Sequence, residues 1–339
     1  MTTETVTTTG GAPGGTPAQA RRSVLAYLPL LRSAGILIPF VALFIVLSVT
    51  SDHFATKANL LNILDQQSAT LVMAAAGTLV MISGGIDLSV GATYTLCAIV
   101  GGYCVVNAGL PIWLSVLIAL ATGLLVGVVN GFISTVLRIN SLIATLAMSF
   151  IVLGIASKAT GGNVIILSLE HPNFAKIAQS SWLGVRTSIW IAIVALVIMG
   201  IALSSTTFGR HTYAAGGNPE AARLAGVRVT AIRIATFAAS GVAAAIAGIV
   251  DTSRTLSAQS SSGGASLSFA VLACIVVGGT SILGGDGAIW RTTIGVLFIA
   301  LVYNGFSQLG VDPLYQQITL GVILLLAVGL DAWTRLSRR

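Results

Sequence analysis

Charged residues are scarce in this chain of 339 residues. Asp, Glu, Lys and Arg make up 8% of it, whereas a soluble domain carries roughly 25%. Hydrophobic residues make up 55%, more apolar surface than a soluble core could absorb. The composition therefore excludes an ordinary soluble domain and predicts an all-α polytopic membrane protein.

The residues and motifs of common enzyme and metal sites are also missing. The three cysteines, Cys97, Cys104 and Cys274, lie in apolar runs without C-x-x-C or Cys/His spacing, which predicts neither a disulfide nor a metal site. No G-x-x-x-x-G-K-[ST], H-E-x-x-H or G-x-S-x-G motif occurs. We therefore expect no catalytic site, no bound cofactor and no metal in this chain, and we expect it not to be an enzyme.

Long hydrophobic runs are what the sequence has in abundance. Ten runs are long enough to span a bilayer and are bounded by polar residues; they fall near 34–50, 67–86, 88–107, 111–135, 142–158, 187–206, 230–250, 266–283, 288–308 and 314–332. The runs are too long for strands and lack period-two alternation, so sheet is not expected. Only GGID separates the second run from the third and only GGDG the eighth from the ninth, so these joints are either tight turns or breaks within the membrane.

The distribution of Lys and Arg predicts the orientation. With the N-terminus inside, 12 of the 17 basic residues fall on the cytoplasmic side, so both termini are expected there. Residues 1–33 are expected to form a disordered cytoplasmic tail, 34–332 the transmembrane domain, and 333–339 a basic cytoplasmic tail. The outer loop over 159–186 is either a partial helix on the membrane surface or a docking site for an external partner, and the sequence does not decide between these.

A weak internal repeat suggests two inverted five-helix halves, an architecture of transporters. ISGGIDLS (82–89) matches IAGIVDTS (246–253) at an offset of 164 residues, and NGF at 130–132 recurs at 304–306 at an offset of 174. Five expected spans separate the copies, and this odd number inverts their topology.

A few polar or small residues within the runs are candidates for a permeation path or gate. They are Gly84, Gly85, Asp87, Ser89, Asn130, Thr145, Ser149 and Asn304. Each has a structural alternative: the glycines allow close helix packing, the polar side chains bond neighbouring helices, and Asp87 caps the following span. The acidic residues otherwise fall in loops or at span ends, which gives little support to ion coupling.

The segment GGNPEAARLAG (216–226) predicts a short polar helix between two apolar runs. Asn218 is a favourable N-cap and Pro219 falls at the first helical position. Glu220 suits the helix dipole, and Gly226 stands where a left-handed C-cap is usual. Two turns of helix are too short to be stable alone, so we expect a docking partner.

Four segments together resemble the permease subunits of bacterial ribose-type ABC sugar importers: SGGIDLSVGA (83–92), NSLIATLAMSFIVLGIA (140–156), TFGRHTYAAGGNPEAARLAGV (207–227) and VGGTSILGGDGAIWRTTIG (277–295). The resemblance covers nearly all of residues 34–332. One departure is Ser141, where the family pattern has Pro after Asn140, and this weakens substrate inference from that segment.

The resemblance implies the partners and the mechanism. It implies a pore of two permease chains in the bacterial cell (inner) membrane, which we expect to be a homodimer, with a heterodimer as the alternative. It also implies a cytoplasmic ATPase that binds ATP and Mg, and an external sugar-binding protein; no nucleic acid is expected. The short helix would be the coupling helix, with ATPase-coupling residues Phe208, Gly209, Arg210, Tyr213, Gly216, Gly217, Asn218, Glu220, Ala221, Ala222, Arg223 and Gly226. The expected function is import of a monosaccharide by alternating access; the alternative is an ion-coupled secondary sugar transporter.

Overall fold

The computed structural model describes residues 35–167, 171–312 and 314–336. The chain divides into two units, Met1–Gly35 and Ile36–Arg339, and the fold below is that of the second. The expected disordered tail over 1–33 lies outside the described residues. At the other end, helix α14 extends to Leu336, beyond the expected end of the last run at 332.

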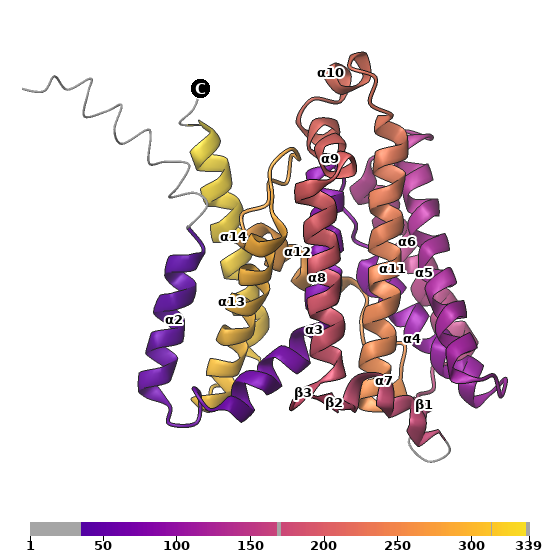
Figure 1. Cartoon of the computed structure of the whole chain (residues 1–339), viewed down its shortest axis with the longest axis vertical. Helices are drawn as coiled ribbons and strands as arrows, with labels where there is room; N and C mark the ends of the chain where they lie inside the picture. The colour runs from indigo at the N-terminus through magenta and orange to yellow at the C-terminus, as the bar shows by residue number, and fades with distance from the viewer. Residues whose placement is uncertain (1–34, 168–170, 313, 337–339) are drawn as a thin grey trace, which may run out of the picture. The chain divides into compact units, whose positions relative to one another are not determined.

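Ten of the described helices have 13 residues or more (Figure 1). They are α2 (Leu37–Thr50), α3 (Lys57–Ile82), α4 (Val90–Val106), α5 (Ile112–Thr135), α6 (Ser141–Thr160), α8 (Thr187–Ser205), α11 (Val229–Thr255), α12 (Ala265–Val277), α13 (Ile289–Gln308) and α14 (Tyr315–Leu336). Each overlaps one of the apolar runs. The largest difference is at α3, which begins at Lys57 although its apolar run begins near 67.

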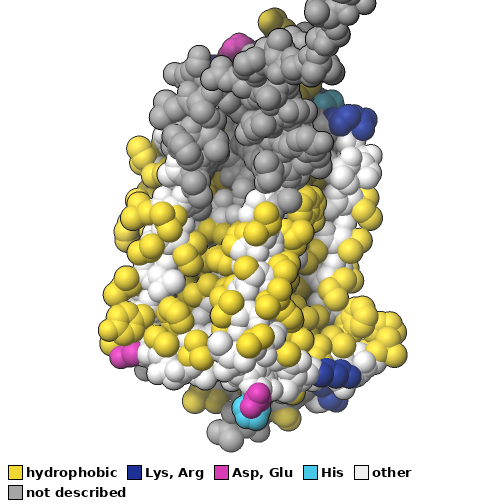
Figure 2. All heavy atoms as spheres, turned by 90° about the vertical axis from the view of Figure 1, so that its left-hand side faces the viewer, with side chains coloured by type: hydrophobic (Ala, Val, Ile, Leu, Met, Phe, Trp, Pro, Cys, Tyr) yellow, Lys and Arg dark blue, Asp and Glu magenta, His cyan; other side chains and the backbone are white. Residues whose placement is uncertain are grey.

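The apolar surface of these helices is typical of a membrane protein. The helices α5, α6, α8, α11 and α13 are long and apolar enough to cross a membrane, and α2, α4, α12 and residues 315–326 of α14 are shorter apolar helices. Figure 2 shows hydrophobic side chains over one flank of the bundle, with charged side chains towards its ends. The expectation of a mostly helical polytopic membrane protein is confirmed.

The core forms around α11, which packs against α3, α4 and α5. Small residues bring these backbones together: a Cβ atom on Gly123 of α5 would lie 2.3 Å from the carbonyl oxygen of Gly241 on α11, and one on Gly241 would lie 2.0 Å from that of Gly123. Helices approach this closely in membranes where side chains are absent. The α5–α11 contact therefore depends on glycine on both sides.

Short strands occur in the loops, which the sequence did not lead us to expect. Between α6 and α8 lie β1 (Ile165–Ile166), the 3-10 helix η1 (Pro172–Ala175), α7 (Lys176–Gln179), β2 (Ser181–Trp182) and β3 (Val185–Arg186), and β4 (Ser257–Ala258) follows α11. The strand β1 pairs antiparallel with β4, and β2 pairs with β3. Two-residue pairings satisfy backbone groups of the loops, whereas the long apolar runs are helical.

Both glycine-rich joints are breaks between helices. The linker 83–89 joins α3 to α4, and the linker 278–288 joins α12 to α13. Gly84, Gly284 and Gly285 have φ angles of 85°, 90° and 75°, which L side chains rarely adopt. The backbone N–H of Gly285 donates to the carbonyl of Ile82, the last residue of α3, at 2.9 Å. A Cβ atom on Gly284 would lie 3.0 Å from the Cα of Gly84, so the two linkers are in direct contact.

The internal repeat follows only one of the two offsets. The match at 164 is wrong as a structural correspondence, because residues 83–89 form a linker whereas 246–253 lie inside α11. An offset of 174 instead relates α3, α4, α5 and α6 to α11, α12, α13 and α14, with every helix end agreeing within about three residues. The NGF copies lie at this offset, near the ends of α5 and α13.

Candidate functional site

Two short helices, α9 (Thr207–Gly217) and α10 (Pro219–Leu224), project from one end of the bundle (Figure 1). The Asn218 side chain accepts from the backbone N–H of Ala221 at 3.0 Å, and Pro219 occupies the first helical position. After the helix, Gly226 has φ +84° and its N–H donates to the carbonyl of Arg223 at 2.9 Å. The expected short helix and both its caps are confirmed; α9 before it was not foreseen as a separate helix.

The α10 helix has one buried face and one polar exposed face. Ala222 packs against Ala215 of α9 and Val229 of α11. On the other side, Glu220 and Arg223 form an ion pair at 3.0 Å. Leu224 is 91% exposed. Glu220, Arg223 and Leu224 are therefore accessible to a protein partner.

The C-terminal end of α9 makes close backbone contacts with the segments around both linkers. A Cβ atom on Gly216 would lie 1.7 Å from the carbonyl oxygen of Ile82, at the end of α3, and 2.7 Å from the amide nitrogen of Gly285. Gly285 would in turn place a Cβ atom 2.8 Å from the Cα of Gly217. We call this meeting of Gly84, Gly216, Gly217, Gly284 and Gly285 the glycine junction. At this junction the backbone of α9 therefore lies directly against the end of α3 and against the second linker, with no side chain of its own between them.

Arg233 of α11 ties the same segments together. Its Nε donates to the carbonyl of Ser83 in the first linker at 3.0 Å, and a terminal nitrogen donates to the carbonyl of Ala215 on α9 at 3.4 Å. The Ser83 hydroxyl also lies 3.1 Å from that of Thr236. Arg233 was not among the expected site residues. Nothing in its local sequence distinguishes it from neighbouring arginines such as Arg223 and Arg228.

Tyr213 connects α9 to the second linker. Its hydroxyl donates to the carbonyl of Gly287 at 2.7 Å. Burial raises the pKa of this phenol, so it stays a hydrogen-bond donor at neutral pH. The remaining expected coupling residues of α9 and α10 are partly buried and partly exposed. Gly209 is buried against the backbone of Leu203, and Phe208 is partly buried. Arg210 and Ala221 are exposed.

The expected path residues gather around the first linker. The Asp87 carboxylate accepts from the backbone N–H of Ser89 at 2.9 Å, from its hydroxyl at 2.7 Å and from the Ser240 hydroxyl at 2.7 Å. Ser89 itself accepts from the Asn130 amide at 2.7 Å, and Thr145 accepts from the N–H of Leu88 at 2.9 Å. These bonds tie the linker to α5, α6 and α11. Asp87 thus holds the turn before α4, although Ser89 is the N-cap residue.

Two expected path residues lie outside this group. The Ser149 hydroxyl donates to Leu146 in its own helix at 2.7 Å. Asn304 lies far along the chain and exchanges amide hydrogen bonds with Asn59 at 3.1 and 3.0 Å. A role of any of these residues in permeation stays a prediction.

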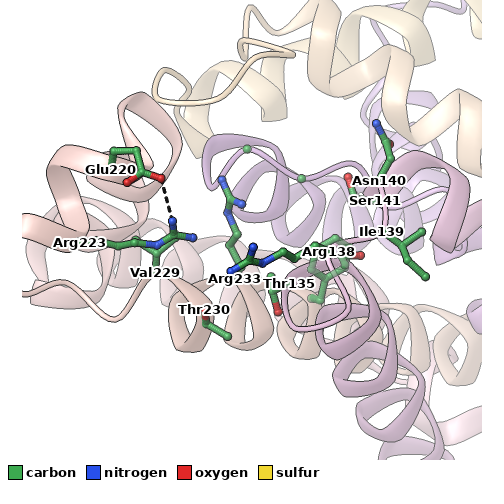
Figure 3. A pocket seen from close by; sticks show the side chains of 14 residues that line it. Thr135, Arg138, Ile139, Asn140, Ser141, Glu220, Arg223, Val229, Thr230 and Arg233 are labelled. Carbon is green, nitrogen blue, oxygen red and sulfur yellow. Dashed lines mark hydrogen bonds and ion pairs between the residues drawn. The ribbon is translucent and has the colours of Figure 1, made fainter.

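A cavity of about 540 Å³ opens between α10, α11, the first linker and the α5–α6 loop. Figure 3 shows Arg138, Arg223 and Arg233 around it, with Glu220 bonded to Arg223. Gly84 and Gly85, two of the expected gate residues, also line it. The cavity therefore joins the α10 surface to the linker, and its lining carries three guanidinium groups and one carboxylate.

Apolar helices, two internal breaks and a polar cavity at one of them define a membrane transport protein of the permease class. The chain belongs to the family described as branched-chain amino acid transport system / permease component, whose model matches residues 59–328. No solved structure matches the chain.

Curated relatives cover nearly the whole chain. The L-arabinose transport system permease protein AraH of Escherichia coli (strain K12) is 36% identical over 90% of this chain and 92% of its own. The ribose import permease protein RbsC of the same strain is 37% identical over 87% of this chain and 92% of its own. The L-arabinose ABC transporter permease protein AraH of Azospirillum brasilense is 36% identical over 95% and 93%. The resemblance to ribose-type ABC sugar permeases is confirmed: the chain is a permease subunit of the bacterial cell membrane, not an enzyme.

Proposed function

We propose that this chain forms half of the membrane pore of an ATP-driven importer for a monosaccharide, a pentose, hexose or related small polar solute. The relatives are named for L-arabinose and ribose, which supports a neutral sugar as the solute. Transport proceeds by alternating access, in which a cavity opens to one side of the membrane at a time.

The observation that carries this proposal is the contact between α9 and the linkers. The α10 helix presents Glu220, Arg223 and Leu224 outward, and Gly216 rests against Ile82 at the end of α3. A partner that moves α10 must therefore move the linkers as well. In this proposal α10 is the coupling helix, and the partner is a cytoplasmic ATPase that holds ATP and Mg on its own chain.

The proposed topology has ten membrane spans in two inverted halves, with both termini in the cytoplasm. Its support is the charge distribution: the α9–α10 end carries Arg138, Arg210, Arg223, Arg228 and Arg233, and cytoplasmic loops are enriched in basic residues. The 174-residue offset relates four helices of each half and supports the inversion.

The remaining partners follow from the same proposal. One chain supplies half a pore, so a second copy completes a homodimer, and a sugar-binding protein delivers the solute to the outer face. At the end away from α10, Figure 1 shows β1, β2, β3 and α7. The strand β4 pairs with β1 and η1 packs against α7, so they belong to the same face.

Reconstitution tests the proposal. The permease is placed in liposomes with its ATPase and binding protein, and uptake of labelled ribose, L-arabinose and glucose is measured. We expect uptake that requires ATP and both partners and is insensitive to ionophores. Uptake by the permease alone that an ionophore abolishes would instead establish an ion-coupled transporter.

A further inference from the structure

A second polar cavity, of about 410 Å³, lies between the start of α3, the end of α13 and the start of α14. Figure 1 shows these helix ends at the side of the bundle away from α10. Seven of the 17 Asn and Gln side chains of the chain line it, and none of its described lining residues is charged. We call it the amide cavity. Such a concentration of primary amides in so apolar a chain is unlike the rest of the surface.

The amides occupy matching faces of two helices. Asn59, Asn62, Gln66 and Gln67 follow the spacing of one face of α3, and Asn304 and Gln308 are one turn apart on α13. The amides of α3 and those of α13 meet at Asn59 and Asn304, whose side chains exchange two hydrogen bonds. This pair joins α3 to α13 at the cavity.

The other amides keep their hydrogen-bonding capacity. Among the described residues, the side chains of Asn62, Gln66, Gln67 and Gln316 have no hydrogen-bond partner. Each amide offers two N–H donors and a carbonyl acceptor. The cavity volume lies within the roughly 300–1,000 Å³ typical of small-molecule sites.

The chemistry selects a class of ligand. A sugar hydroxyl both donates and accepts, as an amide does, whereas an ion would find no opposite charge in this lining. We propose that the amide cavity binds the neutral monosaccharide at the outer end of the transport path. The proposal rests on the proposed function, which it extends by assigning a sugar site to the permease itself.

The internal repeat supports this placement. The 174-residue offset relates Asn59 and Ile63 of the amide cavity to Arg233 and Phe237, which line the cavity beside α10. The repeat therefore builds one cavity at each end of the bundle from equivalent helices. Their linings differ: neutral amides at one end and arginines at the other (Figure 3). A lining that holds sugar only at the outer end favours capture outside and release inside.

The test is saturation-transfer-difference NMR on the permease–ATPase complex in nanodiscs, without the binding protein. The probes are ribose and L-arabinose, with ribose 5-phosphate as the anionic comparison. Gln67→Ala on α3 and Gln316→Ala on α14 remove one amide each, and Gln317→Ala is the matched control because Gln317 is exposed and does not line the cavity. Since a neutral hydrogen bond contributes about 1 kcal/mol, each cavity variant should weaken sugar binding by about fivefold.

The outcomes separate this proposal from the proposed function. Sugar signals in the wild type and in Gln317→Ala, reduced in Gln67→Ala and Gln316→Ala, would support the amide cavity; if one cavity variant fails to fold, the other, on a different helix, decides. Absence of sugar signal, equal signal in all variants, or stronger binding of ribose 5-phosphate would overturn it, even in a complex that imports sugar with ATP. A complex that binds sugar but never imports it would refute the proposed function alone.

Discussion

At the end of α9, Gly216 occupies a position that has no room for a side chain. A Cβ atom there would lie 1.7 Å from the carbonyl oxygen of Ile82. Gly154 of α6, by contrast, would place its Cβ atom in open space, with nothing within 4 Å. The two glycines therefore provide a test of the glycine junction.

We expect Gly216→Ala to force α9 away from the linker. Overpacking of this kind costs about 1–3 kcal/mol, and because this contact is the one proposed to transmit motion, we expect uptake to fall by about fivefold or more. Gly154→Ala should keep normal uptake. ATP-dependent sugar uptake in proteoliposomes, with the melting temperature of each variant, measures the difference. Equal uptake by both variants would show that transmission does not pass through this contact.

At the scale of the element, α10 combines precise capping with an exposed charge pair. Glu220 is 81% exposed at its side chain and, among the described residues, pairs only with Arg223 of the same helix. An exposed pair on one helix contributes little to stability. In the proposed function, the same pair serves as a contact for the ATPase.

Glu220→Lys should therefore uncouple ATP hydrolysis from transport and leave the fold intact. A lysine in place of the carboxylate stands beside Arg223 and reverses the charge that α10 presents at position 220, and a like-charge contact costs several kcal/mol at an interface. We expect uptake to fall by about tenfold or more, with basal ATP hydrolysis retained, in parallel assays on the reconstituted complex. Glu220→Gln, which removes the charge without reversing it, should be less severe. Normal uptake by Glu220→Lys would reject α10 as the coupling helix.

The elements differ in how far the sequence alone predicts them. Apolar runs bounded by polar residues located the long helices well, and the caps around Asn218 and Gly226 located α10, because both signals are local. The start of α3 was missed, since Asn59, Asn62 and Gln66 interrupt the apolar run that marks a span. Those same amides, at helical spacing, were the signal for the amide cavity.

Contacts between distant segments could not be predicted in this way. The proximity of Gly216 to Ile82 and the bonds of Arg233 to Ser83 and Ala215 join parts of the chain that only the fold brings together. Likewise, the choice between offsets of 164 and 174 needed helix boundaries. In a chain rich in glycine and isoleucine, identical residues at a fixed offset do not show whether a segment is a linker or lies inside a helix such as α11.

At the scale of the whole molecule, the two ends of the bundle differ in charge and in their cavities. The α10 end carries the arginine-lined cavity, and the opposite end carries the amide cavity and the short strands. Direction of transport depends on which end faces the cytoplasm. Leu224 on α10 and Leu183 in the β2–β3 turn are exposed residues at the two ends, 91% and 74% accessible.

Single cysteines at these positions report the orientation. In a Cys104→Ser background, the remaining Cys97 and Cys274 are buried and should not react. A membrane-impermeant maleimide should label Leu183→Cys in intact cells, and should label Leu224→Cys only after the membrane is permeabilised. The reason is the excess of arginine at the α10 end, which basic-residue bias assigns to the cytoplasm. The reverse labelling would place α10 outside the cell, where no cytoplasmic ATPase could bind it. It would also place the amide cavity on the cytoplasmic side, where it could not capture sugar from outside.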